Sequence, residues 1–295
     1  MSERVTAVLQ ALFVTFLWST SWVLIKIGLE EIPALTFAGL RYSLAFLCLV
    51  PLIGRRLGWA TFRSLPARTW GRLLLLGILF YAVTQGAQFL GLVYLPAVTV
   101  SLLLNFTSIF VAIMGITFLA ERPGHLQWAG MVLFLVGVLV YFYPVIFPAG
   151  ELLGLVIVMV GVLANAGSAV LGREVNRQRD VSPLLVTVVS MGSGSFILLG
   201  TGVAVQGLPP LSLTSWLIIG WLALVNTAFA FTLWNLTLRT LTAVESSIIN
   251  NSMLIQIAIL AWLFLGERLS GQEIMGLVLV ALGVLLVQVR SRQKK

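Results

Sequence analysis

A few polar and aromatic side chains lie inside segments of the chain that are otherwise apolar. Such groups are costly in a lipid environment unless they face other helices or a water-filled cavity, so they are the first candidates for binding a polar solute. Amides and hydroxyls would hydrogen-bond the solute, indole rings would stack on it, and a guanidinium would pair with a carboxylate. The candidate substrate-binding residues are Trp18, Arg41, Tyr81, Gln85, Gln88, Asn105, Asn226, Trp234 and Asn251.

The spacing of these residues gathers some of them on one helix face. Tyr81, Gln85 and Gln88 stand at positions i, i+4 and i+7, which form one stripe along a helix. The stripe fits the lining of a cavity, and it equally fits hydrogen bonds between packed helices. Two amides, Asn105 and Asn251, are predicted to face each other near the middle of the membrane, or each braces a neighbouring helix.

Trp18 and Arg41 each allow two interpretations. Trp18 falls in mid-span rather than at the membrane interface, where tryptophans usually gather, and this favours stacking on a substrate. Arg41 lies roughly 10 Å along its helix from the outer end of the span. Its guanidinium is either the counter-ion of a substrate carboxylate or a group that snorkels to the outer interface.

The acidic residues offer less chemistry. Glu245 is the only carboxyl candidate for proton coupling, and its place at a helix start also suits the helix dipole. Glu121 and Glu267 each precede an arginine, so local ion pairs are expected there. The sequence has a single cysteine, Cys48, and no metalloprotease or Walker motif. We therefore predict no enzyme, no catalytic residue, no cofactor and no metal site.

The composition indicates the class of fold that positions these side chains. Of the 295 residues, 59% are hydrophobic and only 9% are charged, whereas soluble domains carry about 25% charged residues. Because helices satisfy their own backbone groups in lipid, the sequence predicts an all-α integral membrane protein in the lipid bilayer. Its net charge of +8 reflects loop topology, not a nucleic-acid partner. The predicted spans are 5–28, 35–53, 71–92, 97–119, 126–143, 152–172, 183–205, 214–238, 244–265 and 271–289.

An internal repeat relates the two halves of the chain. Residues from 94 onward match residues from 240 onward at a constant offset of 146, pairing Asn105 with Asn251 and Glu121 with Glu267. The predicted repeats are 1–148 and 149–295. Each holds five of ten helices, and an odd number means that the second enters the membrane from the opposite side. Lys and Arg then concentrate inside if both termini are cytoplasmic, in a multi-pass protein of the cytoplasmic (inner) membrane.

Short motifs add a resemblance to a known family. Each half has a Glu-Arg step after its fourth helix, Leu-Ala-Glu-Arg at 119–122 and Leu-Gly-Glu-Arg at 265–268, and the first helix contains Leu-Trp-Ser-Thr-Ser-Trp at 17–22. This pattern resembles the EamA-type members of the drug/metabolite transporter superfamily. The resemblance implies ten helices in two halves, and export of amino acids, other metabolites or toxic organic compounds from bacteria.

Inverted repeats also suggest a mechanism. Two similar bundles of opposite orientation can exchange conformations and open a shared midplane site first to one side and then to the other. We expect a secondary transporter that exports small amino-acid-like or organic metabolites, with the first, third, fourth, sixth, eighth and ninth helices lining the cavity. The fifth and tenth helices would be peripheral supports or a homodimer contact. The alternative is a channel or a lipid-type flippase built from the same bundle.

Overall fold

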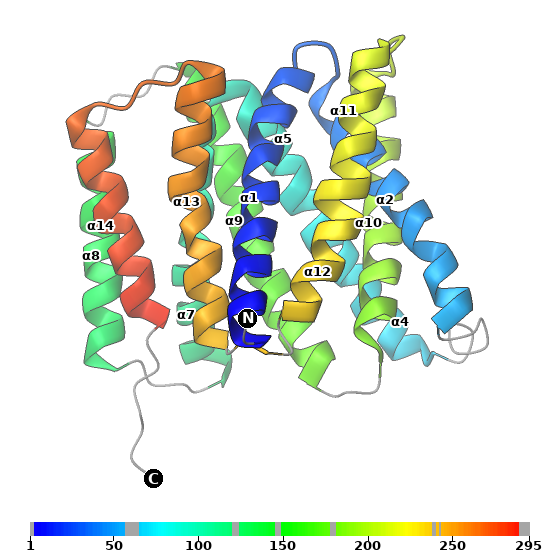
Figure 1. Cartoon of the computed structure of the whole chain (residues 1–295), viewed down its shortest axis with the longest axis horizontal. Helices are drawn as coiled ribbons and strands as arrows, with labels where there is room; N and C mark the ends of the chain where they lie inside the picture. The colour runs from blue at the N-terminus through cyan, green and yellow to red at the C-terminus, as the bar shows by residue number, and fades with distance from the viewer. Residues whose placement is uncertain are drawn as a thin grey trace. The chain divides into compact units, whose positions relative to one another are not determined.

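The computed structural model describes residues 3–56, 65–119, 124–144, 149–177, 181–237, 240–241 and 243–288, and every regular element in them is a helix (Figure 1). The ten predicted helical segments are confirmed. They are α1 (Glu3–Gly28), α2 (Ala34–Arg56), α4 (Ala67–Gly77) with η1 (Ile78–Thr84) and α5 (Gln85–Tyr94), α6 (Ala97–Leu104) with α7 (Phe106–Leu119), α8 (His125–Phe142), α9 (Ala149–Arg177), α10 (Pro183–Gln206), α11 (Leu213–Ala223) with η2 (Leu224–Phe229) and α12 (Ala230–Thr237), α13 (Ala243–Leu265) and α14 (Gly271–Gln288).

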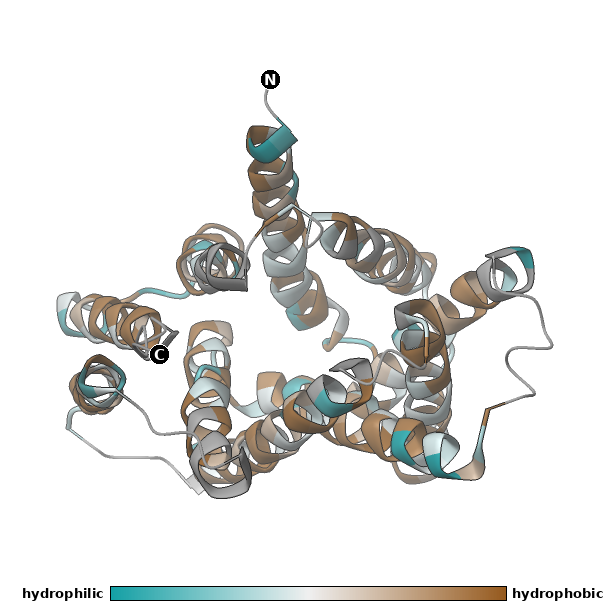
Figure 2. Cartoon of the chain, turned by 90° about the horizontal axis from the view of Figure 1, so that it is seen from below, coloured by the Kyte–Doolittle hydropathy of each residue, from teal (hydrophilic) through white to brown (hydrophobic). Residues whose placement is uncertain are grey.

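The helices have the length and composition of membrane spans. Within the described residues, 6 helices are long and apolar enough to cross a membrane, and four shorter apolar stretches accompany them: Ala97–Val111, Leu213–Phe229, Ser252–Leu265 and Gly271–Leu286. Figure 2 shows apolar residues along the helices and more hydrophilic stretches at several helix ends. Helices satisfy their backbone hydrogen bonds internally, so such elements are stable in lipid.

The chain forms two compact units, and each takes segments from both halves of the sequence. Unit 1 comprises residues 1–23, 94–155 and 230–295, and unit 2 comprises residues 24–93 and 156–229. This division follows spatial contacts, whereas the repeats at 1–148 and 149–295 follow sequence similarity. The assignment of those repeats as domains stays a prediction.

In unit 1, the last helices of the two repeats, α8 and α14, pack side by side and antiparallel (Figure 1). A Cβ atom at Gly137 would lie 2.6 Å from the backbone nitrogen of Val280, and one at Gly283 would lie 2.5 Å from that of Phe134. Gly137 and Gly283 are equivalent at the offset of 146, so exchanging the repeats exchanges the two contacts. This antiparallel relation between equivalent helices is what an inverted repeat requires.

In unit 2, the second helices of the two repeats, α2 and α10, form a similar antiparallel pair. A Cβ atom at Gly202 would lie 2.5 Å from the backbone nitrogen of Thr36, and one at Gly192 would lie 2.6 Å from the ring of Phe46. Gly194 packs in turn against the backbone of Gly77. The small residues of α10 are therefore a helix-packing surface, as is common in membranes.

Two π-helical turns interrupt equivalent spans. η1 begins at Ile78 and η2 begins at Leu224, again 146 residues apart. The hydroxyl of Thr84 donates to the carbonyl oxygen of Leu79 at 2.8 Å, and that of Thr227 donates to the carbonyl oxygen of Leu222 at 2.8 Å. Turns of this kind often occur at functional sites, and candidate residues lie within or beside both of them.

Candidate functional site

Arg41 is buried in unit 2, with 5% of its surface exposed. Its Nε donates a hydrogen bond to the hydroxyl of Thr227 at 3.2 Å, and its guanidinium carbon lies 5.0 Å from the centre of the Tyr42 ring. The side chain is thus directed into the helix packing, and the snorkelling interpretation is wrong. Among the described residues, Arg41 forms no ion pair with a carboxylate.

Tyr42 connects Arg41 to the polar stripe of the third span. Its hydroxyl donates to Oε1 of Gln85 at 2.6 Å, and its ring packs edge-on against that of Tyr81, with centres 5.5 Å apart. Gln88 lies one turn beyond Gln85 and is half-buried. The structure therefore brings two members of the stripe into one buried group around Arg41.

Asn226 belongs to the same unit and is fully buried in η2, directly before Thr227. Neither Thr227 nor Tyr42 was a predicted site residue. The repeat contained a signal for the first of them, because Thr227 is equivalent to Tyr81 at the offset of 146. For Tyr42, the only signal of a role in the site was its position next to Arg41 in the sequence.

Unit 2 also holds a cavity of about 220 Å³ that is lined by residues of α4, η1, α9 and α10. Tyr81 is one of its walls. The other polar residues that line it were not predicted, although they recur at the helical spacing i, i+3 on two helices: Asn165 and Ser168, and Thr187 and Ser190.

Unit 1 contains an aromatic cluster built by α1 and α12. The ring of Trp18 lies 5.2 Å from that of Phe231, at an interplanar angle of 54°, and 5.2 Å from that of Trp234, at 50°. The structure thus brings together the two tryptophans predicted to stack on a substrate. Phe231 was not predicted, but it is the equivalent of Gln85 in the second repeat.

The predicted amide pair is described only in part. Asn105 stands between α6 and α7, and its Nδ2 donates to the carbonyl oxygen of Ser101 at 2.8 Å, one turn earlier in the same span, so both interpretations of Asn105 stay predictions. Asn251 lies in α13, but its side chain, like that of Glu245, is outside the described part of the chain.

Gln256 ties α13 to α1 inside unit 1. Its Oε1 accepts a hydrogen bond from the hydroxyl of Ser19 at 2.9 Å, and its Nε2 lies within donating distance of the hydroxyls of Thr15, at 3.2 Å, and Ser252, at 3.0 Å. All of these contacts join neighbouring helices or successive turns of one helix. For this residue the structure favours a role in holding helices together.

The prediction that Glu267 forms an ion pair with the adjacent Arg268 is wrong. Its carboxylate accepts hydrogen bonds from the backbone nitrogens of Ala97, at 2.7 Å, and Val98, at 3.3 Å. Both nitrogens belong to the first turn of α6, where backbone N–H groups have no partner within the helix and the helix dipole favours an anion. Glu267 therefore caps α6. Its counterpart Glu121 lies outside the described residues.

Glu31 makes an analogous contact in unit 2. Its carboxylate accepts hydrogen bonds from the hydroxyls of Ser212 and Ser215, both at 2.6 Å, at the start of α11. These two hydrogen bonds stabilise the ionised form and hold the pKa of Glu31 below its ordinary value. The carboxylate thereby links the loop after α1 to the N-terminus of α11.

These features define a multi-pass α-helical membrane protein with two inverted halves and buried polar groups within its apolar helices. The chain belongs to the EamA-like transporter family, whose sequence model matches residues 5–143 and again residues 152–289. The predicted membership of the drug/metabolite transporter superfamily is confirmed. The sequence analysis predicted a transporter and not an enzyme, and the family that the chain belongs to is one of transporters.

Several known proteins are similar to this chain. The uncharacterized transporter YvbV of Bacillus subtilis (strain 168) is 28% identical, over 98% of this chain and 93% of that protein. A probable amino-acid metabolite efflux pump of Escherichia coli (strain K12) is 26% identical, over 93% of this chain and 92% of that protein. A crystal structure matches with a TM-score of 0.70 at 16% identity, over 99% of this chain and 100% of the other, and this shows the fold alone.

Proposed function

We propose that this protein is a secondary transporter of the cytoplasmic membrane that exports small carboxylate-bearing metabolites, such as amino acids, by alternating access. Membership of a transporter family supports the general class. The substrate class is supported by the efflux-pump relative, and the location by the uncharacterized inner membrane transporter YedA of Escherichia coli (strain K12), which is 25% identical over 74% of this chain. The distribution of Lys and Arg supports cytoplasmic termini.

The environment of Arg41 is the observation that carries the proposal. A buried guanidinium is costly unless a negative charge offsets its desolvation. Its described neighbours are a neutral hydroxyl on Thr227 and the ring of Tyr42, and only Nε is occupied by the hydrogen bond to Thr227. A substrate carboxylate would supply the missing charge and could accept two parallel hydrogen bonds from the terminal nitrogens.

The other candidates serve the rest of the substrate in this proposal. Trp18 and Trp234 contact its apolar part during the transport cycle, because indole rings bury large areas while tolerating varied shapes. Amides and hydroxyls contact its amino or other polar groups without adding charge. The residues proposed for this second role are Tyr81, Gln85, Gln88, Asn105, Asn226 and Asn251.

Counterflow in proteoliposomes tests the proposal. Purified protein would be reconstituted into vesicles loaded with one unlabelled amino acid, and uptake of the labelled compound would be followed over a panel of amino acids and their decarboxylated amines. We expect saturable uptake of at least one acid that is stimulated by the same compound inside, and loss of this uptake in Arg41→Gln. Retained uptake in that variant would contradict the assigned role of Arg41.

The same vesicles separate the alternatives. Flux that rises linearly with concentration, without stimulation from the opposite side, would indicate a channel. Movement of a labelled phospholipid between leaflets, with no flux of any solute, would indicate a flippase. Either result would overturn the proposed carrier.

A further inference from the structure

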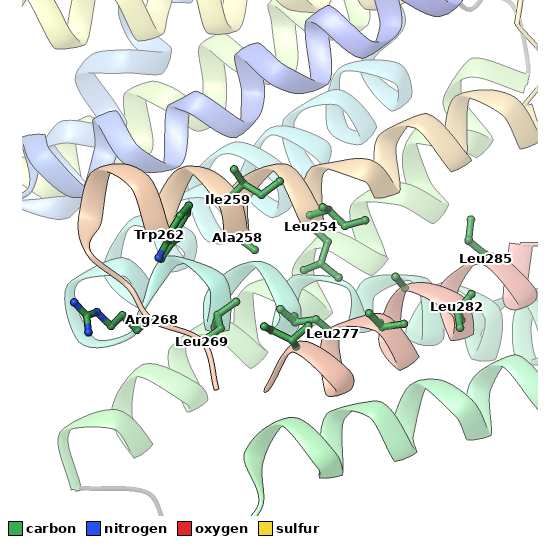
Figure 3. A pocket seen from close by; sticks show the side chains of 13 residues that line it. Leu254, Ala258, Ile259, Trp262, Arg268, Leu269, Leu277, Leu282 and Leu285 are labelled. Carbon is green, nitrogen blue, oxygen red and sulfur yellow. The ribbon is translucent and has the colours of Figure 1, made fainter. Parts of the chain in front are cut away.

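A long groove runs between α13 and α14 in unit 1, on a face of the helices that none of the predicted substrate-binding residues lines (Figure 3). Its volume is about 940 Å³. On α14 the lining residues recur at helical spacing, as Ile274, Val278 and Leu282 show, and Ile255 and Trp262 line the opposite wall. The groove is thus a continuous feature of two neighbouring helices.

The walls of the groove are apolar and open. Ile255 and Trp262 are each 59% exposed, and Val278 is 52% exposed. In a membrane-spanning chain such a surface faces hydrocarbon, and a concave apolar surface makes more contacts with a chain laid along it than a convex one does. An acyl chain is the abundant flexible molecule of matching chemistry in that environment.

Among the described residues that line the groove, Arg268 is the charged one. Figure 3 shows it at one end, close to Trp262 and Leu269, with its guanidinium pointing away from the apolar side chains. Within the described residues Arg268 makes no ion pair, since the carboxylate of the adjacent Glu267 is held by the amides of Ala97 and Val98. Its charge is therefore available for an anion at this end.

The length of the groove corresponds to one leaflet. Along α14 it extends from Ile274 to Leu285, which is roughly 16 Å of helix and about half of a hydrocarbon core of roughly 30 Å. Trp262 lies near the charged end, and tryptophans favour the depth of lipid headgroups. A cation and an indole at one end with aliphatic walls beyond them match the order of groups in a phospholipid.

We propose that the groove between α13 and α14 binds a membrane phospholipid, with its phosphate at Arg268 and one acyl chain along α14. The lipid is a resident of this surface and not the transported compound. The proposal stands on the groove and its charge, so it does not depend on the transported substrate. A second copy of the chain is the competing occupant, and the test below separates the two.

Native mass spectrometry of the full chain tests the proposal with two lipids that differ only in the headgroup. Delipidated protein in detergent would be titrated with dioleoyl phosphatidylglycerol and with dioleoyl glycerol, which has the same acyl chains and no phosphate. We expect the phospholipid to bind at least about fivefold more tightly to the wild-type protein. In Arg268→Gln this preference should disappear, while Arg268→Lys should retain most of it.

Two further variants test the acyl-chain site and the specificity. Ala281→Trp should fill the groove and weaken binding of both lipids, and Ala258→Trp makes the same test from the other wall if the first variant does not fold. Arg68→Gln removes one exposed arginine elsewhere and should leave both affinities unchanged. Thermal unfolding and circular dichroism would show that each variant keeps its fold.

Several outcomes would overturn the proposal. These are equal affinities of the two lipids for wild-type protein, an unchanged phospholipid affinity in Arg268→Gln, and wild-type protein with no lipid adduct. Binding that survives in both groove-filling variants would overturn it as well. A dimer that Ala281→Trp converts to monomers, with lipid binding intact, would assign the groove to a second copy instead.

Discussion

Two stripes of side chains occupy equivalent positions in the two repeats, 146 residues apart: Tyr81, Gln85 and Gln88, and Thr227, Phe231 and Trp234. A π-helical turn overlaps the start of each stripe. In the first stripe Gln85 accepts a hydrogen bond from Tyr42, whereas in the second Phe231 packs against Trp18. Both repeats therefore have the π-helical turn, but the side chains beside it make a polar contact in the first repeat and an aromatic contact in the second.

In the α8–α14 pair, by contrast, the two repeats have the same residues at equivalent positions of contact. There the equivalent residues are the same glycine, and Gly137 and Gly283 make the same kind of backbone contact. Where helix axes must approach closely, the repeats have kept the same residue, because any side chain would separate the backbones. Where side chains surround a polar or aromatic group, as at Gln85 and Phe231, the residues of the two repeats differ.

The largest expected effect lies at the shared glycines. Gly137→Leu and Gly283→Leu should each lower the free energy of unfolding by about 3 kcal/mol, and by similar amounts, because the new side chain meets partner backbone. Thermal unfolding in detergent would measure both. Gly220→Leu is the matched control, since no atom of the described residues lies within 4 Å of a Cβ atom at Gly220. Unequal effects at the two sites would contradict their structural equivalence.

The next effect tests whether the two stripes are interchangeable. Gln85→Phe places in the first repeat the residue that the second repeat has at the equivalent position, Phe231. The buried hydroxyl of Tyr42 then lacks its acceptor, which should lower the free energy of unfolding by about 1–3 kcal/mol. Phe231→Gln copies the first into the second and places an amide against Trp18, at a similar cost. The measurement is again the thermal midpoint of each variant.

A double-mutant cycle identifies the cause at Gln85. With Tyr42→Phe in the background, Gln85→Phe should cost clearly less, because no hydroxyl is left unpaired. Additive losses in the cycle would mean that the hydrogen bond between Tyr42 and Gln85 contributes little. If both stripe exchanges were neutral, the difference between the repeats would have no structural meaning.

The smallest effect concerns pH at Glu31. Because hydrogen bonds lower the pKa of Glu31 in the folded protein, they add stability above its unfolded pKa, and this stability is lost as pH falls through the folded pKa. Ser215→Ala should raise the pKa of Glu31 toward its ordinary value. The variant should therefore be less stable than wild type at neutral pH, and this difference should shrink in acid.

Thermal midpoints between about pH 7 and pH 3 would follow this change. Ser190→Ala is the control, because within the described part of the chain the hydroxyl of Ser190 bonds backbone carbonyls and no carboxylate. A stability difference for Ser215→Ala that stays constant across the range would contradict the contact with Glu31.

Much of the fold could be predicted from local patterns in the sequence. Apolar runs of about 20 residues and the offset of 146 indicated the spans and their relation, because both signals lie in the order of residue types. The same signals do not report distances across the fold. They gave no sign that a unit would combine the start of α1 with α13, or that Gln256 would bond Ser19.

The candidate site was predictable as a set of residue types and not as a set of contacts. Trp18 and Trp234 meet in the structure, and Arg41 is buried near Gln85 through Tyr42. Glu267 shows where the inference failed, because its neighbour in sequence is an arginine but its partners are amides 169 and 170 residues away. The sequence shows which charged groups require a hydrogen-bond or ion-pair partner. Which partner each group contacts depends on how the helices pack.

The central claim is that Arg41 recognises a carboxylate, and the most direct measurement is a comparison of transport for an amino acid and its carboxamide. Their kcat/KM values would be determined in proteoliposomes for wild-type protein and for Arg41→Gln. We predict that wild type prefers the acid by at least about 30-fold, as expected for a desolvated charge pair, and that Arg41→Gln transports both compounds equally slowly. If Arg41→Gln kept the full preference for the acid, Arg41 would not be the counter-ion and the account would be wrong.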